Sequence, residues 1–306
     1  MNALLLMQRL VPAFGLVANA VRFPGVRCGL RVEIAGPGSL SYGAGVSIGQ
    51  ETRIDLAAGA ALDLGERVSV SRNVHIVPEA GRRIRVGAAT TVQDGCRIYG
   101  DVSIGRNCIF APNVFISSGT HAFDTIPHRL IQEQDRLAPV PTRPIRIFSD
   151  CWFGINSVVA PGVTVGRGCV IGANSVVTDD LAPYSVAVGC PARVVRRRLE
   201  FAPKSRIEAT QQTDAPYFYD GFAPAAAADA LHAEADFTVA LHHDNPHAVR
   251  LCLSGQGGSI TFEGQREELP KKSDVIEFPM RAREGVLPLL TFQANSRCAV
   301  RWAELL

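Results

Sequence analysis

The most regular segment of the chain is VGAATTVQDGCRIYGDVSIGRNCIFAPNVFISSGTH, residues 86–121, and it repeats with a period of six. Each unit begins with a large apolar residue, and three places later comes Gly, Asn or Asp. These residue types tolerate a left-handed backbone, so the chain can turn a corner once in every unit. A second block of the same units covers residues 147–182, and across both blocks only Ala89 breaks the corner rule.

The place after each corner is also restricted, because it is small or β-branched in every unit except the last, where it is Leu181. The twelve units begin at Val86, Val92, Ile98, Ile104, Phe110, Ile116, Ile147, Phe153, Val159, Val165, Ile171 and Val177. One large and one small inward residue per unit, Ile116 with Thr120 for example, would fill a narrow prism. A period of six fits neither an α-helix nor a hairpin array, but it fits a parallel β-solenoid with one short strand and one corner per unit.

The pattern resembles the hexapeptide-repeat acyltransferases, whose chains coil as a left-handed parallel β-helix with three units per turn. Weaker units extend the resemblance upstream, and they begin at Ile48, Ile54, Leu64, Val70 and Ile76. The resemblance covers about residues 26–200. It implies an all-β fold, and it implies a homotrimer because the active sites of this family lie between neighbouring prisms.

The rest of the chain divides around this prism. The six-residue period is lost over residues 117–146, and loops of that length are usually functional. Residues 201–235 are rich in Pro and Ala and predict a linker with one short helix. Residues 236–306 alternate short apolar runs with turn signals such as Gly257–Gly258, which predicts a small antiparallel β-domain. We expect that domain to help hold the acceptor.

Residues 1–25, MNALLLMQRLVPAFGLVANAVRFPG, are the one segment that could be a targeting sequence. Its longest uninterrupted apolar run, Ala3 to Met7, is too short to span a bilayer, and it lacks a basic start. We expect a helix whose apolar face caps the open end of the solenoid. The alternative is peripheral contact with the inner face of a membrane.

The composition argues against nucleic acid as the main partner, because 31 Lys and Arg residues nearly balance 29 Asp and Glu residues. Four cysteines, Cys96, Cys108, Cys151 and Cys169, occupy small inward places and are therefore predicted to be packing residues without disulfide partners. Reduced cysteines are typical of the cytosol, so we expect a cytoplasmic protein.

The loop begins SSGTHAFDTIPHR and resembles that of the sugar and small-molecule O-acetyltransferase branch of the family, in which a histidine just after such a coil is the catalytic base. His121 has that place, and imidazole can accept a proton near neutral pH. Asp124 is predicted to orient His121 or to position the acceptor. His128 and Arg129 follow the family's tendency to place basic residues after the base, and we assign them to the acceptor. A solvent-facing loop histidine is the alternative for His121.

The segment Cys151–Trp152–Phe153–Gly154 resembles the family's Trp-x-Gly unit, whose tryptophan leaves the prism wall beside the active site. Trp152 is out of phase with the inward places and should point outward, toward acceptor, cofactor or a neighbouring subunit.

The family binds acetyl-CoA in a groove between prisms. The positions matched to that groove are Ala160, Ala173, Thr178, Arg193 and Arg196. Members of the family often have a lysine where this chain has Asp179. An aspartate cannot pair with a CoA phosphate as a lysine can, so the phosphate contacts expected from the family do not carry over at this position.

The resemblance therefore implies an acetyl-CoA-dependent O-acetyltransferase that acts on a sugar or a surface-polysaccharide precursor by direct transfer, without a metal. One alternative is N-acetylation of a nucleotide-linked amino sugar, and another is a scaffold without activity that binds glycan or protein. The related γ-class carbonic anhydrases hold zinc with three histidines. His75, His121 and His128 do not have the spacing of those ligands.

Overall fold

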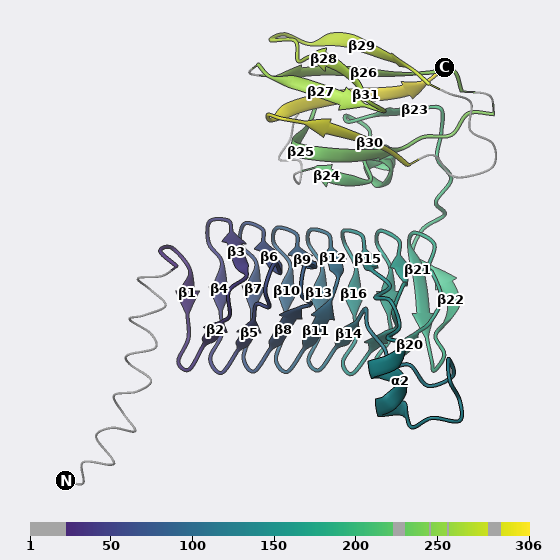
Figure 1. The fold of residues 1–306 in the computed structure, drawn as a ribbon. Coiled ribbons are helices and arrows are strands. Elements are labelled where there is room, and N and C mark those ends of the chain that lie inside the picture. The colour runs from purple at the N-terminus through teal and green to yellow at the C-terminus, as the bar shows by residue number, and fades with distance from the viewer. Residues whose placement is uncertain (1–22, 223–229, 245, 256, 281–288) are drawn as a thin grey trace. The chain divides into compact units, whose positions relative to one another are not determined.

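The computed structural model describes residues 23–222, 230–244, 246–255, 257–280 and 289–306. The chain divides into two compact units at Leu199 and Glu200. Each unit is built of strands (Figure 1). The helix expected over residues 1–25 lies almost entirely outside the described residues.

The first unit is a parallel β-solenoid in which three sheets form the faces of a prism. Sheet A holds β1 (Arg27–Cys28), β4 (Ser47–Ile48), β7 (Ser69–Val70), β10 (Thr91–Val92), β13 (Ile109–Phe110), β16 (Trp152–Phe153), β19 (Val170–Ile171), β21 (Ser185–Val188) and β22 (Arg193–Arg197). Sheet B holds β2 (Glu33–Ala35), β5 (Arg53–Asp55), β8 (His75–Pro78), β11 (Arg97–Gly100), β14 (Phe115–Ser117), β17 (Val158–Val159) and β20 (Val176–Val177). Sheet C holds β3 (Ser39–Tyr42), β6 (Ala61–Leu64), β9 (Arg83–Val86), β12 (Val102–Ile104), β15 (Ile145–Ile147) and β18 (Thr164–Val165). Only β22 runs antiparallel, to β21, among the strands described in these sheets.

The predicted repeat is confirmed by burial and by backbone conformation. The large apolar residues that open all twelve units, and the five weaker ones upstream, are buried in one continuous core. Nine of the twelve corner residues, all of them within the described part, have φ between 56° and 84°. Ala89 is one of the nine, although its Cβ disfavours that conformation. At Asp101 the corner is made instead by Gly100, with φ of 91°.

One inward place was predicted wrongly. Thr120 is exposed, because the chain leaves the prism before it reaches that residue. The buried side chain there is Ser118, whose Oγ accepts a hydrogen bond from the N–H of Asp101 at 2.7 Å. The regular coil therefore ends at Ser118, and the loop begins there.

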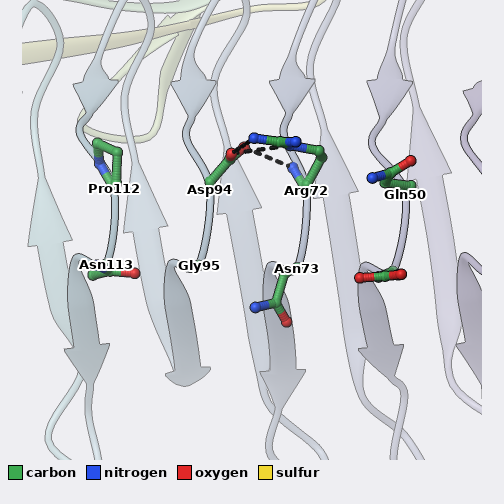
Figure 2. Close-up of a pocket in the computed structure, with 8 residues that line it drawn as sticks. Gln50, Arg72, Asn73, Asp94, Gly95, Pro112 and Asn113 are labelled. Carbon is green, nitrogen blue, oxygen red and sulfur yellow. Dashed lines mark hydrogen bonds and ion pairs between the residues drawn. The ribbon is translucent and has the colours of Figure 1, made fainter.

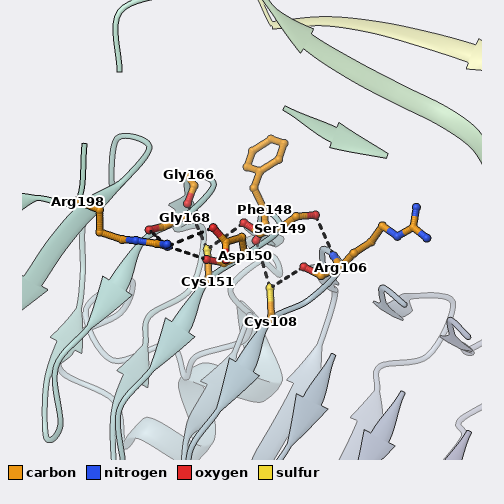
Figure 3. A network of polar contacts seen from close by, with 9 residues as sticks. All are labelled: Arg106, Cys108, Phe148, Ser149, Asp150, Cys151, Gly166, Gly168 and Arg198. Carbon is orange, nitrogen blue, oxygen red and sulfur yellow. Dashed lines mark hydrogen bonds and ion pairs between the residues drawn. The ribbon is translucent and has the colours of Figure 1, made fainter. Parts of the chain in front are cut away.

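The small inward residues also donate hydrogen bonds from one coil to the next. Cys108 Sγ donates to Phe148 O at 3.3 Å, and Cys151 Sγ donates to Gly166 O at 3.2 Å (Figure 3). Thr90 Oγ1 makes the same contact with Gly105 O at 2.9 Å. Each of these side chains donates a hydrogen bond to a backbone carbonyl near a corner that would otherwise lack a donor inside the prism. Cys and Thr suit these places because they are small and carry a donor.

Burial also makes most thiols unreactive. Burial raises the pKa of Cys96 and Cys169 to about 11, and it raises the pKa of Cys151 well above the ordinary value. Thiolate is the reactive form, so these side chains should resist alkylation at neutral pH. We expect one fast-reacting thiol per native chain, that of the exposed Cys190, in a timed labelling experiment followed by mass spectrometry.

Substitution Cys190→Ser is the control for that experiment and should remove the fast reaction. Rapid labelling of Cys96 or Cys169 in the native protein would contradict the buried prism.

The second unit is antiparallel. Its elements are β23 (Arg206–Glu208), the 3-10 helix η1 (Gln212–Tyr217), β24 (Asp220–Phe222), β25 (Leu231–Ala240), β26 (Ala248–Gly255), β27 (Ser259–Phe262), β28 (Gln265–Glu268), β29 (Asp274–Pro279), β30 (Leu289–Ala294) and β31 (Cys298–Leu305). The antiparallel β-domain was expected. Within the described part of residues 201–235, which were predicted to be a linker, β23 pairs with β31 and β24 pairs with β25.

Candidate active site

The loop that interrupts the repeat leaves the prism at the edge between sheets B and C, after β14, and returns to it at β15. Its two ends are joined, because the N–H of Arg143 donates to Ser118 O at 3.0 Å. Thr142 Oγ1 also donates to Glu79 Oε2, which lies after β8 on the same edge. The base of the loop is therefore anchored to the prism.

A short helix, α2 (Ile131–Leu137), organises the loop and projects outside the stacked coils (Figure 1). Its Gln134 side chain is 1% exposed and makes three hydrogen bonds. The amide nitrogen donates to Phe123 O and Arg129 O, each at 3.1 Å, and the amide oxygen accepts from the N–H of Ile126 at 3.0 Å. Gln134 thus holds the first half of the loop against α2.

The next residue of α2 contacts the predicted base. Asp135 Oδ2 lies 2.5 Å from His121 Nδ1, and Asp135 Oδ1 accepts a hydrogen bond from the N–H of Ala122 at 2.7 Å. The Ala122 N–H, together with His121, lowers the pKa of the Asp135 carboxyl. An ionised carboxylate at Nδ1 favours the tautomer with the proton on Nδ1. It leaves Nε2 as the acceptor of a proton.

The His121 side chain is 81% exposed, so a substrate can reach Nε2. The carboxylate that contacts it is Asp135 and not Asp124, which is exposed on the same loop. The orienting role predicted for Asp124 therefore passes to Asp135, and only acceptor positioning remains a prediction for Asp124. His128 is also exposed, and Arg129 lies 3.9 Å from Glu133 in an exposed ion pair.

Two of the predicted donor positions lie along one edge of the prism. Ala160 and Thr178 follow β17 and β20 of sheet B on successive coils, as Ser118 follows β14, so they share the edge from which the loop departs. Arg193 is tied to that end by Asp179, whose Oδ2 lies 3.0 Å from Arg193 Nη1. Asp179 thus balances the charge of Arg193. Arg196 is exposed on β22.

The other two predicted positions lie elsewhere on the same chain. Trp152 is 52% exposed and points outward from β16 of sheet A, as predicted. Ala173 follows β19 at the edge between sheets A and B. His121 lies at the edge between sheets B and C, whereas Trp152 points outward from sheet A. The two side chains are therefore on different sides of one prism.

The edge between sheets A and B also carries a shallow polar hollow of about 380 Å³ (Figure 2). Arg72 reaches to the next coil, where its Nε and Nη2 contact Asp94 Oδ2. Asn113 continues the same edge and donates to Asn156 Oδ1 at 3.2 Å. These side chains mostly satisfy one another, so we assign no part of the site to this hollow.

Residues 83–118 and 144–179 match the family described as bacterial transferase hexapeptide (six repeats). The chain carries a hexapeptide-repeat domain. It is 41% identical to galactoside O-acetyltransferase of Escherichia coli over 95 residues, which are 31% of this chain and 43% of that protein. It is 59% identical to a putative acetyltransferase of Staphylococcus aureus over 54 residues, 18% of this chain and 27% of that one. The chain thus spans less than half the length of these curated relatives.

Two solved structures of acetyltransferases are also similar to this chain. The polySia-specific acetyltransferase NeuO is 23% identical, with a TM-score of 0.46 over 58% of this chain and 77% of that chain. A maltose O-acetyltransferase from Clostridium difficile 630 is 32% identical, with a TM-score of 0.34 over 42% of this chain and 67% of that one. Within the described residues, no helix has the length and apolar character needed to cross a membrane.

Three side chains that organise the hexapeptide domain's loop were not predicted: Asp135, Gln134 and Glu79. The helical pattern IQEQDRL could have indicated α2. Nothing in the spacing between His121 and Asp135 indicates that they meet, because their contact depends on how the loop closes.

Proposed function

We propose that the protein transfers an acetyl group from acetyl-CoA to a hydroxyl group of a sugar or surface-polysaccharide precursor, with His121 as general base. The observation that carries this proposal is the pairing of His121 Nδ1 with Asp135, which leaves Nε2 open at the edge that also holds Ala160 and Thr178. The hexapeptide repeats support acyl transfer. The eight free cysteines, all in described residues, fit a cytoplasmic reaction.

The chemistry follows from this geometry. His121 Nε2 removes the proton of the acceptor hydroxyl as its oxygen attacks the thioester carbonyl carbon. The tetrahedral intermediate collapses, the carbon–sulfur bond breaks, and the imidazolium returns the proton to the CoA thiolate. Asp135 stabilises the transient imidazolium and keeps the ring oriented. The buried cysteines are poor nucleophiles, which favours direct transfer without an acyl-enzyme.

The outward residues of sheets A and B support assembly into a trimer. By strand register, sheet A presents Ser47, Ser69 and Thr91 and then Ile109, Trp152 and Val170. Sheet B presents Arg53, His75 and Arg97 and then Phe115, Val158 and Val176. Both faces become apolar over the last three coils. Sheet C stays polar, with Ser103, Arg146 and Thr164.

Two adjacent apolar faces on one prism suit a cyclic assembly in which sheet A of one chain packs on sheet B of the next. This packing would bring Trp152 of one chain to the end of the neighbour's sheet B, where the His121 loop begins. A complete site would then contain residues of two chains. We therefore propose a homotrimer, with about 98 kDa expected from three chains of 32.8 kDa.

The trimer is tested by placing a charge on the apolar face. We expect Ile109→Arg to dissociate the assembly, because an unpaired guanidinium would be buried against the neighbour. Light scattering at micromolar concentration should give the mass of one chain. The matched variant Ser103→Arg puts the same charge on the outward face of sheet C and should remain trimeric. Trimers of both variants, or a monomeric unmodified protein, would contradict the assembly.

The orienting carboxylate is tested by Asp135→Asn. An amide cannot stabilise the imidazolium, and it can favour the wrong tautomer, so we expect the rate of transfer to fall at least about 10-fold with little change in KM for acetyl-CoA. Initial rates over a range of donor concentrations measure both quantities. Asp124→Asn, on the same loop, is the control and should have a smaller effect. Equal losses in the two variants would contradict the role of Asp135.

The function itself is tested by incubating the full chain with acetyl-CoA and a panel of sugars and glycans, and by following CoA release and acetylated product by chromatography. The proposal expects a product whose acetyl group is removed by mild alkali, as an ester is. An alkali-stable product would show N-acetylation of an amino sugar instead. Absence of transfer to every acceptor would favour a binding scaffold.

A further inference from the structure

The C-terminal unit carries a polar hollow of about 370 Å³ that lies outside the hexapeptide domain. Its lining residues come from β25, β27, β28 and β30 and from the segment after β30; they are Asp236, Ser259, Thr261, Arg266, Gln293, Ala294 and Asn295. Pockets of a few hundred cubic ångströms are of the size that binds small ligands. Nothing in the hexapeptide repeat accounts for this hollow.

Strand register builds the hollow. Arg266 pairs with Thr261 across β28 and β27, and Thr261 pairs with Gln293 across β27 and β30. Phe292 pairs with Phe237 across the antiparallel strands β30 and β25. The neighbouring residues Gln293 and Asp236 are therefore opposite each other. Successive residues of a strand point to opposite faces, and these four polar residues therefore share one face.

The alternate residues of the same strands point into the core. Phe262 stacks on Phe292 with ring centroids 4.7 Å apart, and Phe237 stacks on the other side of this cluster at 5.2 Å from Phe292. All three rings are buried. The polar row therefore stands on a packed aromatic layer, and its backbone is held in place before any ligand arrives.

Part of the polar lining is already ordered. Arg266 Nε donates to Ser259 Oγ at 3.0 Å, and the Ser259 N–H donates to Asn295 Oδ1 at 2.7 Å. The side chains of Thr261, Gln293 and Asp236 have no polar partner among the described residues. The hollow thus offers a hydroxyl, an amide and a carboxylate with unused donors and acceptors, next to a guanidinium that is fixed in place.

This combination matches the chemistry of a sugar. Each sugar hydroxyl both donates and accepts, so it needs neighbouring groups of both kinds, which amide, carboxylate and guanidinium side chains supply. The charges of Arg266 and Asp236 cancel within the lining. Glu268 is exposed, pairs with the lining residue Ser259 on the same face as Arg266, and would repel an acidic ligand. The complementary ligand is therefore uncharged.

We infer that this hollow binds an uncharged glycosyl unit of the acceptor glycan. This inference rests on the proposed function for its acceptor class and names a second site at which the acceptor is held. Binding there would raise the local concentration of acceptor for the site at His121, because two linked contacts act together. Short acceptors that cannot occupy both sites would gain nothing from it.

The test uses the full chain and saturation-transfer NMR with neutral oligosaccharides of glucose, galactose, mannose, rhamnose and N-acetylglucosamine, and with acidic ones that contain uronic or sialic acid. The inference expects binding of at least one neutral oligosaccharide. The double variant Thr261→Ala/Gln293→Ala should weaken it at least about 10-fold. Both side chains lack partners among the described residues, so circular dichroism should show a folded protein. Glu267→Gln, a neighbour outside the lining, should bind like the unmodified chain.

The results separate this inference from the proposed function. Loss of neutral-glycan binding in the double variant, with unchanged transfer of acetyl groups to a monosaccharide, would support the inference. The same loss in a chain that shows no acetyl transfer would support the hollow and refute the enzyme. Equal binding by the double variant and the unmodified chain, binding of acidic oligosaccharides alone, or binding of none would overturn the inference.

Discussion

Replacing His121 by Ala should lower the rate of acetyl transfer about 10²–10⁴-fold, the range that general-base catalysis usually contributes. The side chain is outside the prism and packs into no core, so folding, assembly and the affinity for CoA should change little. Steady-state rates and CoA binding by calorimetry measure the two parts separately.

The matched control for this variant is His128→Ala. His128 is exposed on the same loop, and the structure gives it no contact with Asp135. Because His128 is predicted only to contact the acceptor, its removal should leave the rate at saturating acceptor within a few-fold of the original. A His121→Ala protein that transfers acetyl groups at nearly the original rate, with a large loss in His128→Ala, would reverse the assignment of the base.

Replacing Phe153 by Ala should cost about 3–5 kcal/mol of unfolding free energy. The ring is fully buried and stacks on Phe110 of the preceding coil, with centroids 4.8 Å apart and an interplanar angle of 13°. Truncation leaves a cavity between two coils that cannot close, since strands of neighbouring coils are hydrogen-bonded at fixed spacing. Denaturant unfolding at one protein concentration measures the loss.

Phe153→Leu is the conservative comparison, because it keeps most of the volume and should cost less than about 1.5 kcal/mol. A cost for Phe153→Ala within about 1 kcal/mol of zero would mean that the stacked core is loosely packed. A loosely packed core would not hold in place the loop that carries His121.

The solenoid could be predicted from the sequence because its determinants are local and repeat. A corner residue and its successor fix each turn, and burial of the opening apolar residue fixes the face. Ala89 shows that hydrogen bonding to the preceding coil can also hold a corner residue in the left-handed conformation. Its left-handed backbone costs about 1 kcal/mol, yet its N–H donates to Glu66 O on the preceding coil at 2.8 Å.

The parts that could not be predicted depend on contacts between distant residues. Asp135 reaches His121 only because Gln134 and the joined ends of the loop fold α2 back toward it. The segment 201–235 has the composition of a linker, but β23 and β24 become strands through pairing with β31 and β25. Trp152 was correctly expected to point outward, whereas its separation from His121 within one chain follows only from the order of strands in the sheets.

The most direct test of a site shared between chains is complementation. His121→Ala and Trp152→Ala should each have low activity, since each lacks one half of every site. When the two variants are unfolded together at equal amounts and refolded, mixed trimers form. Each interface then has the right pair of chains about one time in four, so activity should recover to about one quarter of that of the unmodified protein. Recovery to no more than the sum of the two separate variants would show that His121 and Trp152 do not act across an interface.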